Sequence, residues 1–227
     1  MAQISDTLQT LSLLEARILG VLIEKENTTP DAYPLTLHGL CAGCNQKSAR
    51  EPVISVGESE VQAALEDLRG RVLVIETYGA SGRVLRYAQN FARVYGVPAA
   101  AVALLAVLML RGPQTVSELR ANSERLYRFD DSSSVEAFLE ELAARASGAL
   151  VTRLPRQAGA REHRWAHLLC GAPAAAAEKD APLPGKDGEH RQLEERVTRL
   201  ECEVAELRAA VKALAGAPGD SPPPADR

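Results

Sequence analysis

The chain has 227 residues, which is enough for one or two domains and a tail. Its net charge of −4 does not favour nucleic-acid binding by the chain as a whole. It has no run of 18 apolar residues and no basic, apolar leader. The sequence therefore predicts a cytoplasmic protein, without a membrane span, whose four cysteines are reduced thiols.

The first helices are marked by their capping residues and breakers. Ser12 and Glu15 have the spacing of a capping box, at the start of a helix expected over residues 13–25. Pro34 suits the first turn of a second helix. Proline lacks a backbone N–H, and the N–H groups of the first turn make no hydrogen bond within the helix.

A third helix and a two-stranded ribbon follow. Gly57 is an acceptable N-cap for this helix, and Gly70 is expected to end it. Residues 72–78 and 83–88 are strand-like and are separated by a turn at residues 79–82. Three helices closed by a β-hairpin are the plan of a winged helix.

The same order of elements returns in the second half of the chain. Pro98 opens an apolar helix, Thr115 and Glu118 form a second capping box, and Ser133 and Glu136 are expected to form a third. Each box marks the start of another helix.

Two further strands, at residues 150–154 and 163–168, complete this second set. The sequence thus predicts a mostly α protein with small β-hairpins, of the α+β class. It places winged-helix domains at residues 11–91 and 98–169.

The C-terminal part predicts a helix that pairs two chains. Residues 172–190 indicate a linker, residues 191–215 a coiled-coil helix, and residues 216–227 a disordered tail. Valine and leucine alternate at spacings of four and three, as in a two-stranded parallel coil. The expected dimerisation residues are Leu193, Val197, Leu200, Val204, Leu207, Val211 and Leu214. The alternative to a homodimer is an amphipathic helix folded back on its own chain.

Amide and basic side chains beside the third helix and on the ribbons are suited to phosphates and base edges. The candidate nucleic-acid-binding residues are Asn45, Gln46, Lys47, Arg50, Arg69, Arg83, Arg86, Arg153, Arg156, Arg161 and Arg164.

Each of these surfaces also has another interpretation. The segment 45–52 can be a solvated loop in which Arg50 and Glu51 make internal hydrogen bonds. The arginines of the second ribbon suit an acidic protein partner as well as a nucleic acid. The third helix of the first domain carries acidic residues that would repel a polyanion, namely Glu58, Glu60, Glu66 and Asp67.

Cys41 and Cys44 have the spacing of two metal ligands, but a structural zinc site needs four ligands and no second pair follows nearby. Both lie on the apolar face of the second helix, which favours buried thiols. A metal or redox sensor that uses them is a weaker alternative. The sequence has no phosphate-binding glycine loop, nucleophile elbow or paired His-Glu zinc motif. We therefore expect no catalytic residues, cofactor or bound metal.

Several segments resemble the YceH-like family of uncharacterised bacterial proteins. The similarity covers about residues 11–215 except the linker, and residues 44–53 (CNQKSAREPV) and 28–35 (TTPDAYPL) carry much of it. The resemblance implies tandem winged-helix domains and brings no established activity. One difference is Ala49, where the family has a polar Asn, and this weakens a base-reading role for that position.

Together these features predict a non-enzymatic, homodimeric protein that binds double-stranded DNA or acts in transcription. The third helices, around residues 58–69 and 133–145, would approach a groove while the ribbons contact the backbone. The alternative is a protein–protein adapter that uses winged-helix surfaces, which the acidic third helix and acidic net charge favour.

Overall fold

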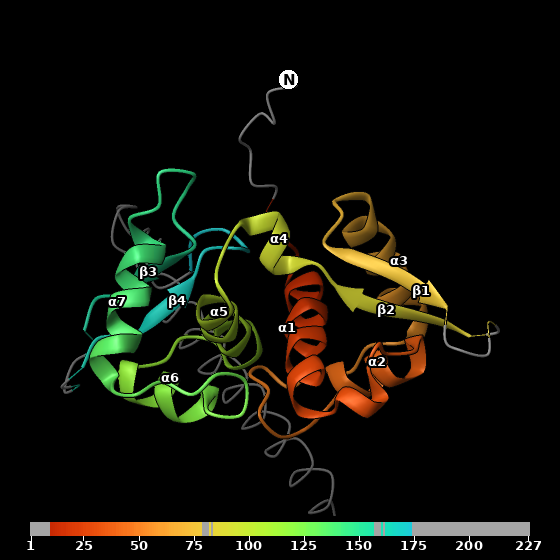
Figure 1. Cartoon of the computed structure of the whole chain (residues 1–227), viewed down its shortest axis with the longest axis horizontal. Helices are drawn as coiled ribbons and strands as arrows, with labels where there is room; N and C mark the ends of the chain where they lie inside the picture. Colours follow the sequence, from red (N-terminus) through yellow and green to blue (C-terminus); the bar gives the residue numbers. More distant parts are fainter. Residues whose placement is uncertain (1–9, 79–81, 83, 157–159, 161, 174–227) are drawn as a thin grey trace, which may run out of the picture. The chain divides into compact units, whose positions relative to one another are not determined.

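The computed structural model of the chain describes residues 10–78, 82, 84–156, 160 and 162–173, which are coloured in Figure 1. The predicted coiled-coil helix, its dimerisation residues and the tail lie outside the described residues, as do Arg83, Arg161 and all of the predicted linker beyond Pro173. None of the described helices combines the length and the hydropathy that crossing a bilayer requires.

The first half contains three helices and an antiparallel hairpin. Its elements are α1 (Leu13–Thr28), the short 3₁₀ helix η1 (Pro30–Ala32), α2 (Leu37–Cys44), α3 (Glu58–Gly70), β1 (Val74–Tyr78) and β2 (Leu85–Gln89). The predicted capping box at Ser12 and the predicted bounds of α3 are confirmed. The role predicted for Pro34 was wrong. α2 begins after Thr36, whose hydroxyl accepts a hydrogen bond from the Gly39 N–H, so Pro34 precedes the helix.

The second half repeats this order. Its elements are α5 (Ala99–Arg111), α6 (Val116–Ser123), α7 (Ser132–Ala143), β3 (Val151–Arg153) and β4 (Trp165–His167). The capping box of Thr115 and Glu118 is confirmed. The box predicted at Ser133 was wrong, because Asp131 is the N-cap of α7 and its carboxylate accepts from the Ser134 N–H. A short helix between the halves, α4 (Phe91–Tyr95), was not predicted. These elements establish the α+β class that the sequence predicts.

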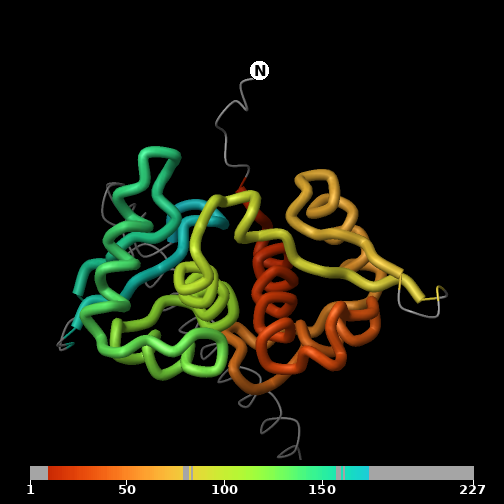
Figure 2. The backbone as a smooth tube through the Cα atoms, in the orientation of Figure 1, coloured from red at the N-terminus to blue at the C-terminus, as the bar shows by residue number. Residues whose placement is uncertain are grey.

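The two halves agree in detail as well as in order. The backbone of Leu35 pairs with Tyr87 in the first hairpin, and the backbone of Gln114 pairs with Trp165 in the second. Leu35 directly precedes Thr36, the N-cap of α2, and Gln114 directly precedes Thr115, the N-cap of α6. Each hairpin therefore gains a third, short strand-like segment from the residue before its second helix. Figure 2 traces the two similar paths through the chain.

The first helices of the halves, α1 and α5, pack against each other between the hairpins (Figure 1). α5 is buried on every side over residues 100–110, as expected for a helix that is apolar all round. A Cβ atom on Gly20 of α1 would lie 2.9 Å from the Leu110 side chain of α5, so glycine permits this close approach. One hydrophobic core extends through both halves.

α3 ends in a Schellman motif in which valine occupies the position usually held by glycine. The Val72 N–H donates to the Arg69 carbonyl and the Leu73 N–H donates to the Leu68 carbonyl, both at 2.9 Å. Val72 has a φ of +60° and its side chain is exposed. A β-branched residue in this left-handed conformation is strained. Because the Val72 side chain is exposed, hydrophobic burial does not offset this strain.

Replacing Val72 with glycine is therefore expected to raise the free energy of unfolding by about 1 kcal/mol, because relief of the strain exceeds the entropy cost of glycine. Urea denaturation followed by circular dichroism measures this change. Val53→Gly is the control, since Val53 is also exposed but lacks a positive φ. Equal destabilisation by the two substitutions would contradict the assignment of strain to Val72.

Candidate functional site

The joint, which we define as residues 45–52 between α2 and α3, turns half of its polar side chains inward. The Asn45 side-chain Nδ2 donates to the Val56 carbonyl at 2.9 Å, and the Val56 N–H donates to Asn45 Oδ1 at 2.8 Å. The Asn45 amide thus pairs with the backbone in the way a neighbouring strand would. These two hydrogen bonds hold the segment that leads into α3 against the end of α2.

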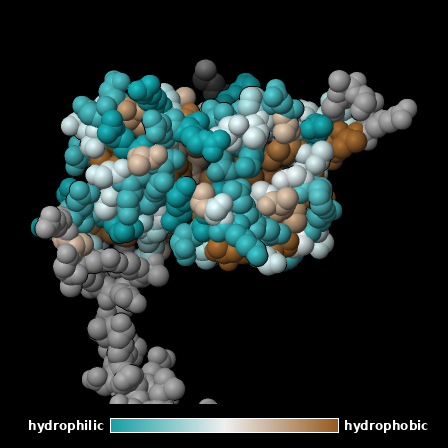
Figure 3. Space-filling view, turned by 90° about the horizontal axis from the view of Figure 1, so that it is seen from below, coloured by the Kyte–Doolittle hydropathy of each residue, from teal (hydrophilic) through white to brown (hydrophobic). Residues whose placement is uncertain are grey.

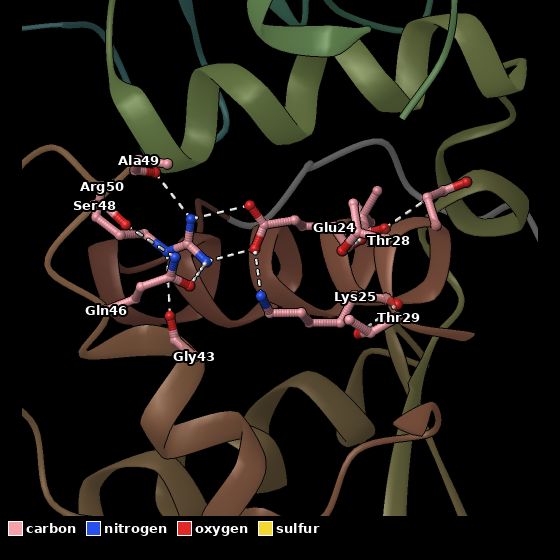
Figure 4. Close-up of polar contacts among 11 residues, drawn as sticks. Glu24, Lys25, Thr28, Thr29, Gly43, Gln46, Ser48, Ala49 and Arg50 are labelled. Carbon is pink, nitrogen blue, oxygen red and sulfur yellow. Dashed lines mark hydrogen bonds and ion pairs between the residues drawn. The ribbon is translucent and has the colours of Figure 1, made fainter. Parts of the chain in front are cut away.

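Arg50 lies at the centre of a buried polar network (Figure 4). It is 5% exposed, and its two terminal nitrogens approach the two carboxylate oxygens of Glu24 on α1 at 3.2 and 2.6 Å. Its Nε donates to the Gly43 carbonyl at 3.2 Å and its Nη1 to the Ala49 carbonyl at 2.9 Å. Gln46 Oε1 accepts a further bond from Nη2 at 3.3 Å. This geometry favours internal hydrogen bonding over nucleic-acid contact for Arg50.

The ion pair makes Glu24 a source of pH-dependent stability. Burial alone would raise the pKa of Glu24, but the hydrogen bond and the charge of Arg50 outweigh burial and lower it below 4.5. A carboxyl group whose pKa is depressed in the folded state stabilises the fold above its unfolded pKa. That stabilisation is lost as the pH falls through the folded pKa.

We therefore expect the stability of the protein to fall as the pH is lowered from about 5 towards 3, and to fall less steeply in the Glu24→Gln variant. Urea denaturation at a series of pH values gives the two slopes. Glu140→Gln, at an exposed carboxyl on α7, should leave the slope of the parent protein unchanged. Parallel profiles for parent and Glu24→Gln would exclude Glu24 as the titrating group.

Ala49 has a φ of +59°, in the left-handed region. Asparagine tolerates this conformation better than alanine does. The Asn that the resemblance to the YceH-like family implies at this position would therefore fit the backbone of the joint without any contact with a base.

Three of the predicted arginines contact other parts of the chain. Arg69 Nη1 lies 3.1 Å from both carboxylate oxygens of Glu76, and Arg86 Nη1 donates to the Pro34 carbonyl at 2.7 Å. Arg164 donates to the Pro113 carbonyl at 2.7 Å and lies 3.3 Å from Glu118 Oε1.

Other predicted cations remain available at the surface. Lys47, Arg153 and Arg156 are exposed and form no salt bridge with any residue that the structure describes. Lys47 lies in the joint, whereas the two arginines lie in and beside the second hairpin. The predicted cations that remain free at the surface are therefore divided between the two halves. Most of the other predicted cations make internal contacts.

The third helices of both halves are acidic on their exposed faces. α3 exposes four carboxylates and α7 exposes three, which are Glu58, Glu60, Glu66, Asp67, Glu136, Glu140 and Glu141. The only cation within α3 is Arg69, which pairs with Glu76, and α7 contains none. On the face shown in Figure 3 the coloured surface is mostly hydrophilic, with small separate apolar areas.

The buried thiols predicted on α2 are confirmed. Cys41 and Cys44 are both buried and form no disulfide with each other, and the Cys41 Sγ donates to the Val56 carbonyl at 3.3 Å. Burial raises the pKa of Cys44 to about 12, which keeps it protonated and poorly nucleophilic at neutral pH. Within the described part of the chain, no three His, Cys, Asp or Glu side chains gather closely enough to hold a metal ion.

A groove of about 450 Å³ lies between the halves and was not predicted. It is lined by the start of α1, the segment 51–56, the end of α5 and residues 166–173. Apolar side chains form most of its walls, and Arg17 and His167 are two polar exceptions. Four separated segments build it, so no local pattern could reveal it. Arg17, a cation among the apolar residues of α1, was the one available signal.

Arg17 is 3% exposed and its Nη2 donates to the Pro52 carbonyl at 2.7 Å. Burial, and then the neighbouring charge of Arg50, lower the pKa of Arg17. Burial also lowers the pKa of His167 to about 4, so its ring is neutral at physiological pH. The Arg17 Nε and the His167 Nδ1 are buried and have no hydrogen-bond partner among the described residues.

Residues 11–160 match the model of a family described as "Protein of unknown function, DUF480". The chain is 56% identical over 201 residues to a UPF0502 protein of Dechloromonas aromatica, which covers 88% of this chain and 93% of that protein. It is 55% identical over 209 residues to a UPF0502 protein of Acidovorax, covering 90% and 92%. It is 52% identical over 228 residues to a UPF0502 protein of Burkholderia orbicola, covering 94% of each chain.

Proposed function

This chain belongs to the family of proteins of unknown function DUF480. We propose that it is a non-enzymatic, tandem winged-helix protein. In this proposal its two acidic third helices bind a basic surface of another protein. The winged-helix assignment is supported by the repeated order of three helices and a hairpin. It is also supported by the matching backbone bridges of Leu35 and Gln114, which add a third short strand to each hairpin.

The carboxylates on α3 and α7 are the observation that carries this proposal. A helix-turn-helix protein inserts its recognition helix into the major groove, where the helix lies between two lines of phosphates. Exposed carboxylates on that helix are repelled by these phosphates and gain no compensating contact. A partner rich in lysine and arginine is instead attracted, and the attraction guides its approach. The geometry thus favours the adapter over the DNA-binding protein.

Neutralising four of these carboxylates tests the proposal. The variant Glu66→Gln, Asp67→Asn, Glu140→Gln, Glu141→Gln should lose partners that the parent protein captures by cross-linking from nuclease-treated lysate. The matched control removes four exposed carboxylates elsewhere, through Asp31→Asn, Glu124→Gln, Asp130→Asn and Glu162→Gln. Equal loss in both variants would indicate a general charge effect, and equal retention would overturn the proposal.

Duplex DNA is a second candidate because Arg153 and Arg156 of the second hairpin are exposed. Fluorescence anisotropy with a random duplex at about 50 mM salt separates the two functions, since phosphate contacts are strong at low salt. We expect no saturable binding. Binding that weakens steeply with salt and is lost in Arg153→Gln, Arg156→Gln would support DNA and count against the acidic helices.

We further propose that the chain forms a homodimer through the heptad residues after residue 190, which lie outside the described residues. The alternation of valine and leucine at these positions supports pairing as a parallel coil. Light scattering should give twice the chain mass for the full protein and a lower mass once residues 188–227 are removed. The same mass for both proteins would exclude this segment as the dimer contact.

A further inference from the structure

The groove between the halves has the size and walls of a small-molecule site. Its volume of about 450 Å³ falls within the range of ligand pockets, which are mostly apolar with a few polar groups that fix orientation. Leu14 contributes from α1, Ile54 and Val56 from the segment before α3, and Leu108 from α5. These side chains come from both halves, so a ligand here would contact both.

Arg17 places a positive charge in this wall without an opposite charge in contact. Among the residues that the structure describes, its terminal nitrogens donate only to the carbonyls of Cys44 and Pro52, at 3.4 and 2.7 Å. No carboxylate that the structure describes lies within 4 Å of its guanidinium. A buried guanidinium that lacks an anionic partner is costly, and an anion supplied from outside removes part of this cost.

His167 adds a second polar group to the same wall. Its Nδ1 is buried without a hydrogen-bond partner among the described residues, as is the Nε of Arg17. Two residues that line one mostly apolar groove thus each hold a nitrogen without a partner, and a ligand that accepts hydrogen bonds can pair with the Arg17 N–H groups and with His167 in the tautomer that carries its proton on Nδ1. A carboxylate accepts several such bonds and carries the required charge.

We propose that this groove binds a small apolar monocarboxylic acid, with its carboxylate at Arg17 and His167 and its hydrocarbon part against Leu14, Ile54 and Leu108. The apolar walls disfavour strongly hydrated polyanions, and Arg17 disfavours cations. Glu51 also lines the groove, and it is exposed. Its charge opposes the ligand, so it limits the affinity.

Octanoate is the first probe, with 1-octanol and octylamine as neutral and cationic molecules of matched chain length, all below micelle-forming concentrations. Isothermal titration calorimetry gives the affinities for the full-length protein. The fluorescence of Trp165 gives a second readout, since it is the single tryptophan and adjoins Ala166 in the groove wall. Octanoate should bind saturably and at least about tenfold more tightly than octanol, and octylamine should not bind.

Two variants locate the site without removing the buried Arg17. Glu51→Gln should tighten octanoate binding about threefold or more because it removes the opposing charge. Ile54→Trp should abolish binding by filling the groove, with circular dichroism to show that the variant is folded. Equal affinity for octanoate and octanol, unchanged affinity in either variant, or no binding of octanoate would overturn the proposal. This experiment needs no macromolecular partner, so its result is independent of the acidic helices.

Discussion

Replacing Arg50 with alanine is expected to lower the free energy of unfolding by about 3–5 kcal/mol, the cost typical of removing one partner from a buried ion pair. The substitution leaves the largely buried carboxylate of Glu24 with Lys25, at 3.3 Å, as its remaining cation, and it removes the donor to the Gly43 carbonyl. Both groups lose most of their hydration where the joint packs against α1, so the loss of their Arg50 partner is costly. Urea denaturation followed by circular dichroism measures the loss.

Two comparisons isolate the buried pair. Arg69→Ala removes the more exposed pair with Glu76 and should cost less than about 1 kcal/mol. Combining Arg50→Met with Glu24→Gln removes both charges, so the double variant should be more stable than the sum of the single effects implies. Similar losses for Arg50→Ala and Arg69→Ala would show that the joint network contributes little to stability.

Replacing Gly20 with leucine is expected to destabilise the protein by about 3 kcal/mol, because overpacking a close helix contact forces side chains and backbone to move. Even a single Cβ atom here would lie 2.9 Å from Leu110 and 3.4 Å from the Cβ of Met109. Gly20→Ala should therefore cost about 1 kcal/mol despite the better helix propensity of alanine. Thermal unfolding followed by circular dichroism compares the series.

Gly70→Ala is the matched control for Gly20. Gly70 also lies in a helix, but nothing stands within 4 Å of the position its Cβ would take. The substitution should therefore be neutral or stabilise by up to about 1 kcal/mol. A Gly20→Leu variant as stable as the parent would mean that α1 and α5 separate readily.

Local signals in the sequence were sufficient for much of the fold. The capping boxes at Ser12 and Thr115 and the glycines at each end of α3 are confirmed, because these features depend on residues within one turn of the helix. The error at Ser133 has a local cause as well. Asp131, two residues earlier, is the N-cap instead, and its carboxylate accepts the hydrogen bond from the first turn of α7.

The orientation of the joint could not be read from the sequence. A polar run with two cations looks like an exposed loop, but Arg50 turns inward because Glu24 stands opposite it on α1, 26 residues earlier. The groove escaped prediction for the same reason. Its walls come from segments separated by more than 100 residues, and only packing of the two halves brings Leu14 and His167 to one surface.

The packing of α1 against α5 sets the distance between the two acidic helices. Buried residues of α3 and α7 belong to one core that extends through both halves, so the packing of this core holds the two helices at a set separation. A partner with two basic patches at the matching separation would engage both helices, and its second contact would form at the high effective concentration of an intramolecular event. A partner with one patch would gain only a single weak contact. Spacing, more than charge alone, would then select the partner.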